Sequence, residues 1–336
     1  MMSSPDLEPD CEAGCAPPRE IAALFGHDAA LAQFDAARRS GRLHHAWMIT
    51  GPKGVGKASL AYTAALQLLA GSGSPDAARQ KVRAQAHPNL LTIRRPWDDK
   101  RKRWRGEITI DEVRRVPDFF SRSGGEDGWR IAIIDSLDEF NRNAANGLLK
   151  TLEEPPTQGL LFLVTHSPGR LLPTIRSQCR QLELRSPPVD ETRDWLIHMH
   201  GVPAEQAAAA SALASGAPGR ALALLQSGAV ELEKDVRTLL DRLPNWDARA
   251  SRRLAARVSS KAGESLRPHL YASLARNAAR LAKENAANGQ APEAWLDAWK
   301  SIQNLETEAE GVYLDAKQAA LAAFAHMESA ARASRN

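Results

Sequence analysis

The chain has 336 residues, a formal net charge of +4 and three cysteines. This length allows two or three domains, and three cysteines are too few for a disulfide scaffold. No run of about 18 apolar residues occurs, so no membrane-spanning helix and no membrane contact are expected. The small positive charge permits contact with DNA without requiring it.

Residues 1–23 are expected to form a flexible tail. The segment is acidic and lacks the basic start and apolar core of a signal peptide, so we expect a cytoplasmic protein. Cys11 and Cys15 lie in this tail and are interpreted as free thiols, with a metal-binding role as the alternative. Cys179 is the remaining cysteine, so a four-thiolate zinc site cannot form and no metal site is expected.

A phosphate-binding loop is predicted at residues 51–57, GPKGVGK, after a buried strand at 46–49. Its glycines let successive backbone N–H groups face a phosphate, and its lysine can reach the outer phosphates. The nucleotide-binding residues of this loop are Gly51, Gly54, Gly56 and Lys57. Ala58 replaces the Ser or Thr that would bind Mg²⁺, and Ser59 is turned about 100° away. A glycine turn that no longer holds nucleotide is the alternative, so binding of ATP stays open.

Basic residues are concentrated at 94–105, where they alternate with Trp97 and Trp104. Such a segment can bind a phosphate backbone and stack on bases. We interpret it as a surface hairpin between strands at 90–93 and 108–110, because exposed β-ribbons often carry Lys and Arg. Contact with DNA is the alternative.

A second motif begins at the apolar strand 131–134, which ends in Asp135. Asp135 stands where a P-loop enzyme places the carboxylate that organises Mg²⁺. Ser136 occupies the position of the glutamate that polarises the attacking water, and Asp138 is a poor substitute because catalytic geometry is narrow. With Ala58, two catalytic groups are missing, so we expect no catalytic residue and no ATP hydrolysis by this chain alone.

Five apolar runs separated by helical stretches predict a parallel sheet covered by helices on both faces. The runs are 46–49, 90–93, 131–134, 160–164 and 181–184. Asp28 is expected to cap a helix that ends at Arg39. After residue 188 the pattern is helical throughout.

Three segments resemble the delta prime subunits of the bacterial DNA polymerase III clamp loader, members of the AAA+ class. They are Leu43–Trp47 leading into GPKGVGK, NRNAANGLLKTLEEPP at 141–156, and LLPTIRSQC at 171–179. The similarity runs from about Leu24 to Phe324.

The resemblance implies an α/β AAA+ P-loop domain with a parallel sheet at 24–186, a small helical lid at 187–227 and an all-helical collar, the oligomerisation domain, at 228–336. It implies a non-hydrolysing stator in a hetero-pentamer with gamma/tau and delta subunits. Through the complex, the chain would help load the sliding clamp onto primed DNA during replication, as part of a holoenzyme with nucleotidyltransferase activity. The alternative is an active AAA+ ATPase, either a motor subunit of the loader or a helicase loader.

The resemblance also assigns further site residues. Thr165 would be a polar sensor of the γ-phosphate, with His166 beside it as either a second sensor or an ordinary loop histidine, and Arg220 would point back at the nucleotide. A trans contact to the ATP site of the neighbouring subunit would come from residues 176–180. These are Arg176, Ser177, Gln178, Cys179 and Arg180, with Gln178 in place of the family's arginine. Arg176 and Arg180 flank it, and either one is a candidate replacement.

Overall fold

The computed structural model describes residues 8–9, 11–20, 23–70, 74–121, 128–311 and 315–334. The chain divides into two compact units, Met1–Ala223 and Leu224–Asn336. The first unit holds the predicted tail, P-loop domain and most of the lid, and the second holds the predicted collar. Within the described residues, no helix is long and apolar enough to cross a membrane.

A five-stranded parallel sheet forms the centre of the first unit, in the order β2-β5-β6-β1-β7. The strands are β1 (Ala46–Thr50), β2 (Leu90–Ile93), β5 (Arg130–Asp135), β6 (Gly159–Thr165) and β7 (Arg180–Glu183). All five predicted strands are therefore confirmed within a residue or two at each end. Because the strands are parallel, the loops that follow β1, β5 and β6 lie at one edge of the sheet.

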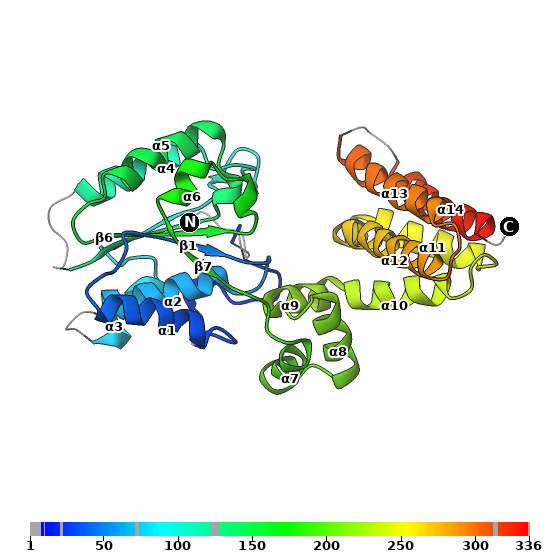
Figure 1. The fold of residues 1–336 in the computed structure, drawn as a ribbon, viewed down its shortest axis with the longest axis horizontal. Coiled ribbons are helices and arrows are strands. Elements are labelled where there is room, and N and C mark those ends of the chain that lie inside the picture. The colour runs from blue at the N-terminus through cyan, green and yellow to red at the C-terminus, as the bar shows by residue number, and fades with distance from the viewer. Residues whose placement is uncertain are drawn as a thin grey trace. The chain divides into compact units, whose positions relative to one another are not determined.

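Helices cover both faces of this sheet, as the fold class predicted (Figure 1). One face carries α1 (Asp28–Arg39), α2 (Lys57–Leu69) and α3 (Pro75–Arg83), and the other carries α4 (Ile110–Ser121), α5 (Arg142–Glu153) and α6 (Pro173–Ser177). Along β1, Trp47 and Ile49 enter the first core, whereas Ala46 and Met48 enter the second. This alternation between two apolar cores explains why the strands read as continuous apolar runs.

Two local predictions were wrong. The cap of α1 is His27, and Asp28 is the first helical residue. Residues 108–110 do not form a strand: Ile108 makes an isolated bridge with Phe140, and α4 begins at Ile110. The basic segment instead pairs with itself, in the two-residue strands β3 (Trp97–Asp98) and β4 (Arg103–Trp104).

The rest of the chain is helical. The region predicted as the lid contains α7 (Val189–His200), α8 (Ala204–Leu213) and α9 (Pro218–Ser227). The helices of the second unit are α10 (Ala229–Leu240), α11 (Ala248–Ser259), α12 (Arg267–Ala287), α13 (Glu293–Gly311) and α14 (Ala316–Ala333). Within this unit α12 packs against α13, and α14 packs against both α13 and α11. Its buried side chains include Leu270, Leu274, Ile302 and Phe324.

Candidate nucleotide-binding site

The P-loop has the backbone that its glycines predict. Gly51 and Gly54 adopt positive φ angles of +146° and +75°. A Cβ atom would lie 2.3 Å from the Leu184 carbonyl oxygen at Gly51, and 2.4 Å from the Arg220 backbone nitrogen at Gly54. Both positions therefore require glycine on two counts, backbone conformation and space. His27 Nε2 lies 2.7 Å from the Val55 carbonyl, which can only accept, so this ring nitrogen carries the proton.

Lys57 begins α2 and is 7% exposed. Its ammonium donates to the carbonyl oxygens of Gly51 and Pro52, both at 2.8 Å. Burial lowers the pKa of Lys57 to about 8, while Asp135 and Asp138 oppose this change. The loop thus holds a cation whose charge depends on pH close to neutrality.

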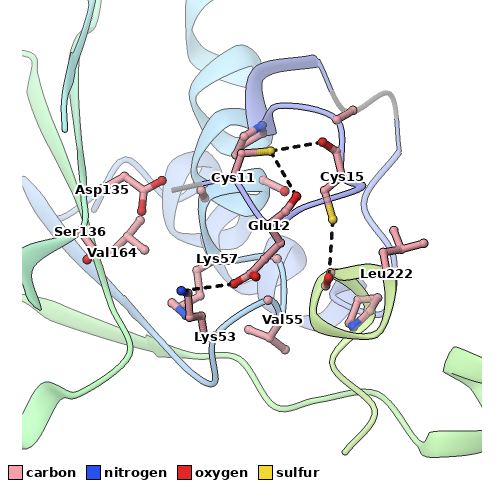
Figure 2. Close-up of a pocket in the computed structure, with 18 of the residues that line it drawn as sticks. Cys11, Glu12, Cys15, Lys53, Val55, Lys57, Asp135, Ser136, Val164 and Leu222 are labelled. Carbon is pink, nitrogen blue, oxygen red and sulfur yellow. Dashed lines mark hydrogen bonds and ion pairs between the residues drawn. The ribbon is translucent and has the colours of Figure 1, made fainter. Parts of the chain in front are cut away.

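A cavity of about 490 Å³ opens beside this lysine. Its walls come from the P-loop, the ends of β5 and β6, and the start of α9, and Figure 2 shows Lys57 and Asp135 among the side chains around it. Ala58 and Ser136, the two residues that replace catalytic groups, both line it. Ser59, expected to point away, is buried and is also part of the wall.

Asp138 has a structural task at this edge of the sheet. Its carboxylate accepts hydrogen bonds from Thr165 Oγ1 at 2.9 Å and from the backbone N–H groups of His166 and Ser167 at 2.8 and 2.9 Å. His166 Nδ1 also lies 2.9 Å from it. Burial lowers the pKa of His166, and Asp138 opposes this shift. Because its oxygens fix the loop after β6, Asp138 is not available to polarise water.

The described part of the N-terminal segment, predicted as a flexible tail, follows a defined path beside the cavity. Glu12 lies 3.7 Å from the Lys53 ammonium, and Cys15 Sγ donates to the Gly219 carbonyl at 3.6 Å (Figure 2). Cys11 Sγ donates to the Cys15 carbonyl at 3.2 Å. Pro9, Cys11, Glu12, Cys15, Ala16, Pro18 and Ala23 line the cavity. Residues 1–7, 10, 21 and 22 lie outside the described part.

Both thiols of this segment are held in the protonated form. Burial is the main cause that raises the pKa of Cys11 to about 11 and that of Cys15 to about 12. The thiolate is the metal-binding form of cysteine, so this environment favours the interpretation of both residues as free thiols.

An aromatic wall completes the cavity. Phe25 and Trp195 stack with ring centroids 5.2 Å apart, and His200 packs edge-on against Trp195 at 4.4 Å. All three line the cavity together with Leu222 of α9. The sequence did not single out these residues, because 170 positions separate Phe25 from Trp195 and no motif connects them.

Arg220 reaches this region through its backbone. Gly219 N–H donates to the Gly54 carbonyl at 2.8 Å, which places the start of α9 directly on the P-loop. The Arg220 side chain is exposed, and Pro218, Gly219 and Leu222 form the cavity wall here. Thr165 is fully buried and bound to Asp138, with Val164 and His166 as the wall residues on its side.

The predicted trans-contact residues lie at the opposite edge of the sheet, where β7 begins. The Arg180 guanidinium lies over the ring of Trp47, 4.9 Å from its centroid. Cys179 Sγ donates to the Ile175 carbonyl at 3.1 Å, and Ser177 Oγ donates to Thr174 at 3.0 Å. Gln178 ends α6 as its C-cap, and Arg176 is half-buried. These five residues therefore form one local surface that does not face the chain's own cavity.

Comparison with known proteins shows what this part of the chain is similar to. Residues 26–188 match the family model described as "DNA polymerase III, delta subunit". DNA polymerase III subunit delta' of Pseudomonas aeruginosa is 34% identical over 199 residues, which cover 57% of this chain and 59% of that protein. The Escherichia coli subunit delta' is also 34% identical, over 57% of each chain.

A second kind of DNA polymerase III subunit is similar as well. Subunit tau of Escherichia coli is 31% identical over 189 residues, covering 54% of this chain and 28% of that protein. The chain thus spans somewhat more than half the length of the delta' relatives it matches. The resemblance predicted from the sequence is confirmed as a similarity: residues 26–188 match the family model, and two delta' subunits are 34% identical over 57% of this chain.

Proposed function

We propose that this chain is a delta prime-type subunit of a bacterial clamp loader, and that it holds nucleotide without hydrolysing it. The observation that carries the second part is the composition of the cavity. Ala58 and Ser136 stand in its wall where a hydroxyl for Mg²⁺ and a carboxylate for water are needed. Asp138, the nearest alternative carboxylate in sequence, is engaged by the loop after β6.

The remaining residues fit the phosphates and base of a nucleotide. Lys57 and the turned backbone at Gly51 and Gly54 suit a phosphate chain. Phe25 and Trp195 supply flat apolar surface for a base. Of the two groups expected to bind Mg²⁺, Asp135 is present and the hydroxyl at position 58 is missing. ATP would therefore bind in a site that lacks part of the usual Mg²⁺ coordination. We therefore propose that binding depends little on Mg²⁺.

The relatives support a proposal for the assembly. We propose that the chain joins gamma/tau-type and delta subunits in the cytoplasm through its second unit, whose helices form an independent core. In that complex it would help place a sliding clamp on primed DNA. The surface at residues 176–180 would face the ATP site of a neighbouring subunit, with Arg180 as its exposed cation.

An active ATPase is the competing proposal. It is favoured by the 31% identity to subunit tau and by the presence of Ser59 in the cavity wall. The presence of Ala58 and Ser136 in place of the catalytic residues argues against it, because hydrolysis needs both the metal ligand and the group that polarises water.

Steady-state ATPase assays of the purified chain and its Lys57→Ala variant decide between the two proposals. We expect equal rates at the level of background. A lysine-dependent turnover on the order of 1 s⁻¹, ordinary for an enzyme, would establish the active ATPase instead.

A further inference from the structure

The segment from Trp97 to Gly106, here called the basic ribbon, has no part in the site described above. It consists of β3, β4, the turn between them, and Arg105 and Gly106 after β4. It carries five cations and two carboxylates, Asp98 and Asp99. The cations are Lys100, Arg101, Lys102, Arg103 and Arg105, and all five side chains are exposed.

The fold fixes the shape of the basic ribbon. Trp97 and Trp104 are cross-strand partners whose rings meet edge-on with centroids 5.3 Å apart. The Asp98 carboxylate accepts from the backbone N–H groups of Lys100 and Arg101, both at 3.0 Å, and these bonds lower the pKa of Asp98. The ribbon is thus preformed, and its indole rings are used to hold the two strands together.

Within the described residues, the cations of the basic ribbon form no ion pair, and Asp98 acts on Arg101 and Arg105 only at longer range. Among the described residues, no carboxylate lies within 4.0 Å of any of its five cations. The two arginines just before it behave differently: Arg94 pairs with Glu8 at 2.6 Å, and Arg95 pairs with Glu139 at 2.9 Å. The change from paired to unpaired cations occurs where the ribbon begins, which marks the ribbon as a surface for an external anion.

Cations from the turn, from β4 and from the residue that follows β4 surround one hollow. It measures about 430 Å³ and is lined by Asp98, Lys100, Arg101, Arg103, Arg105 and Gly106. Guanidinium groups bind phosphate oxygens in bidentate geometry, and a two-stranded ribbon has the dimensions to enter the major groove of duplex DNA. Consecutive phosphates of a nucleic-acid backbone can form ion pairs with several of these cations at once, whereas a single carboxylate cannot.

We propose that the basic ribbon binds the phosphate backbone of duplex DNA, independently of sequence. This rests on the proposed function, which brings the chain to DNA, and it assigns the contact to a specific element of the chain. Because the half-buried rings of Trp97 and Trp104 pack edge-on against each other and hold the two strands together, the exposed surface of the ribbon consists mainly of its cations, which contact phosphates. Its binding should therefore depend steeply on salt and weakly on base composition.

The test uses the full-length chain and fluorescence anisotropy with a labelled random-sequence DNA duplex. The variant Arg101→Ser/Arg103→Ser/Arg105→Ser removes three exposed, unpaired charges. The matched control Arg242→Ser/Arg249→Ser/Arg252→Ser removes three exposed arginines from the second unit. Circular dichroism and thermal unfolding verify that both variants keep the fold.

We expect the ribbon variant to bind at least about tenfold more weakly at low salt, and its slope of log K against log salt to flatten by about 2 to 3, since each phosphate contact contributes roughly 0.9. The control should stay within about twofold, with an unchanged slope. Equal losses in both variants, or no binding by the wild-type chain up to about 10⁻⁴ M, the weak limit of non-specific binding, would overturn the proposal.

Two further outcomes separate this proposal from the proposed function. If the ribbon variant binds DNA normally but loses affinity for the purified sliding clamp, the surface serves an acidic protein and the DNA proposal is wrong. Assembly with tau and delta subunits is measured in parallel by native mass spectrometry. Normal assembly with unchanged DNA binding refutes the ribbon proposal alone, whereas failure to assemble refutes the proposed function.

Discussion

Lys57 shows how one side chain connects burial to ligand binding. It donates to two carbonyls of its own loop, and burial lowers its pKa to about 8. Between about 8 and its ordinary pKa of 10.5, the unfolded chain holds a proton that the folded chain has released. The contribution of Lys57 to stability therefore rises with pH across this window and is lost as pH falls through about 8.

The same shift predicts how nucleotide binding depends on pH. Affinity of the chain for ATP should fall as pH rises through about 8, because only the ammonium form of Lys57 attracts phosphate. Isothermal titration calorimetry from pH 7 to pH 9.5 measures this, a range that runs from about one unit below to about one and a half units above the pKa of Lys57. Lys57→Arg is the control, since guanidinium stays charged and should give a flat profile. A flat profile in the wild type would show that this ammonium does not contact phosphate.

A second prediction concerns Gln178, which stands where the family has an arginine. In the assembled loader, Gln178→Arg should raise the DNA- and clamp-stimulated ATPase severalfold, well below the ~10³-fold effect of a complete arginine finger, because the other sites already turn over. Arg180→Ala should lower the rate by a similar factor, since this exposed cation flanks Gln178.

Arg180 also lies over Trp47, so its removal costs packing as well as charge. Arg180→Lys keeps the charge but changes the geometry, and thermal unfolding of each variant separates loss of stability from loss of catalysis. Arg176→Ala tests the other flanking arginine. Wild-type rates in every variant would mean that residues 176–180 have no catalytic role in trans.

Among the elements, the N-terminal segment has the greatest effect on the candidate site. Its Glu12 carboxylate lies beside Lys53, and seven of its described residues line the cavity that a nucleotide would enter. The carboxylate of Glu12 lies next to a P-loop cation that would otherwise attract a phosphate of the nucleotide. The segment and nucleotide should therefore compete.

Deletion of residues 1–20 is expected to raise nucleotide affinity about tenfold, which corresponds to a site open in roughly a tenth of the molecules. Binding of a fluorescent ATP analogue measures the change. Glu12→Gln should give a smaller rise. Glu20→Gln is its matched control: it removes the same charge from the same segment but outside the cavity wall. Weaker binding after the deletion would make the segment part of the nucleotide site.

The elements also show what sequence could and could not predict. The five strands and the P-loop were predicted because their signals are local: an apolar run and glycines at fixed spacing. The contact of Cys15 with Gly219 joins residues 204 positions apart, and no local pattern encodes it. The strands β3 and β4 are two residues long, too short for any periodicity, and their pairing depends on Trp97 meeting Trp104.

At the scale of the whole molecule, each compact unit has its own core. Both apolar clusters on the sheet draw their buried residues entirely from the first unit. The second unit buries Leu270, Ile302 and Phe324 among its own helices. Independent cores predict that the two units fold separately.

A chain truncated after Ser227, the last residue of α9, should therefore fold and keep its nucleotide affinity within about twofold, since all residues that line the cavity belong to the first unit. It should not join the pentamer, because the proposed collar helices are gone. Circular dichroism and thermal unfolding check the fold, and native mass spectrometry of the mixed subunits checks assembly. Pentamers formed normally by the truncated chain would show that the second unit is not the collar.

The hydrogen bond from Gly219 to Gly54 also limits how this protein can vary. It joins two backbones, so a side-chain substitution elsewhere does not remove either partner. A Cβ atom at Gly54 would meet the Arg220 nitrogen at 2.4 Å, and one at Gly219 would meet the Gly54 oxygen at 2.9 Å. The surface residues of α9 can therefore be substituted without affecting this contact, as long as the two glycines keep the helix close to the loop. The position of α9 against the P-loop thus depends on Gly54 and Gly219, and substitutions at the catalytic positions of the cavity leave it unchanged.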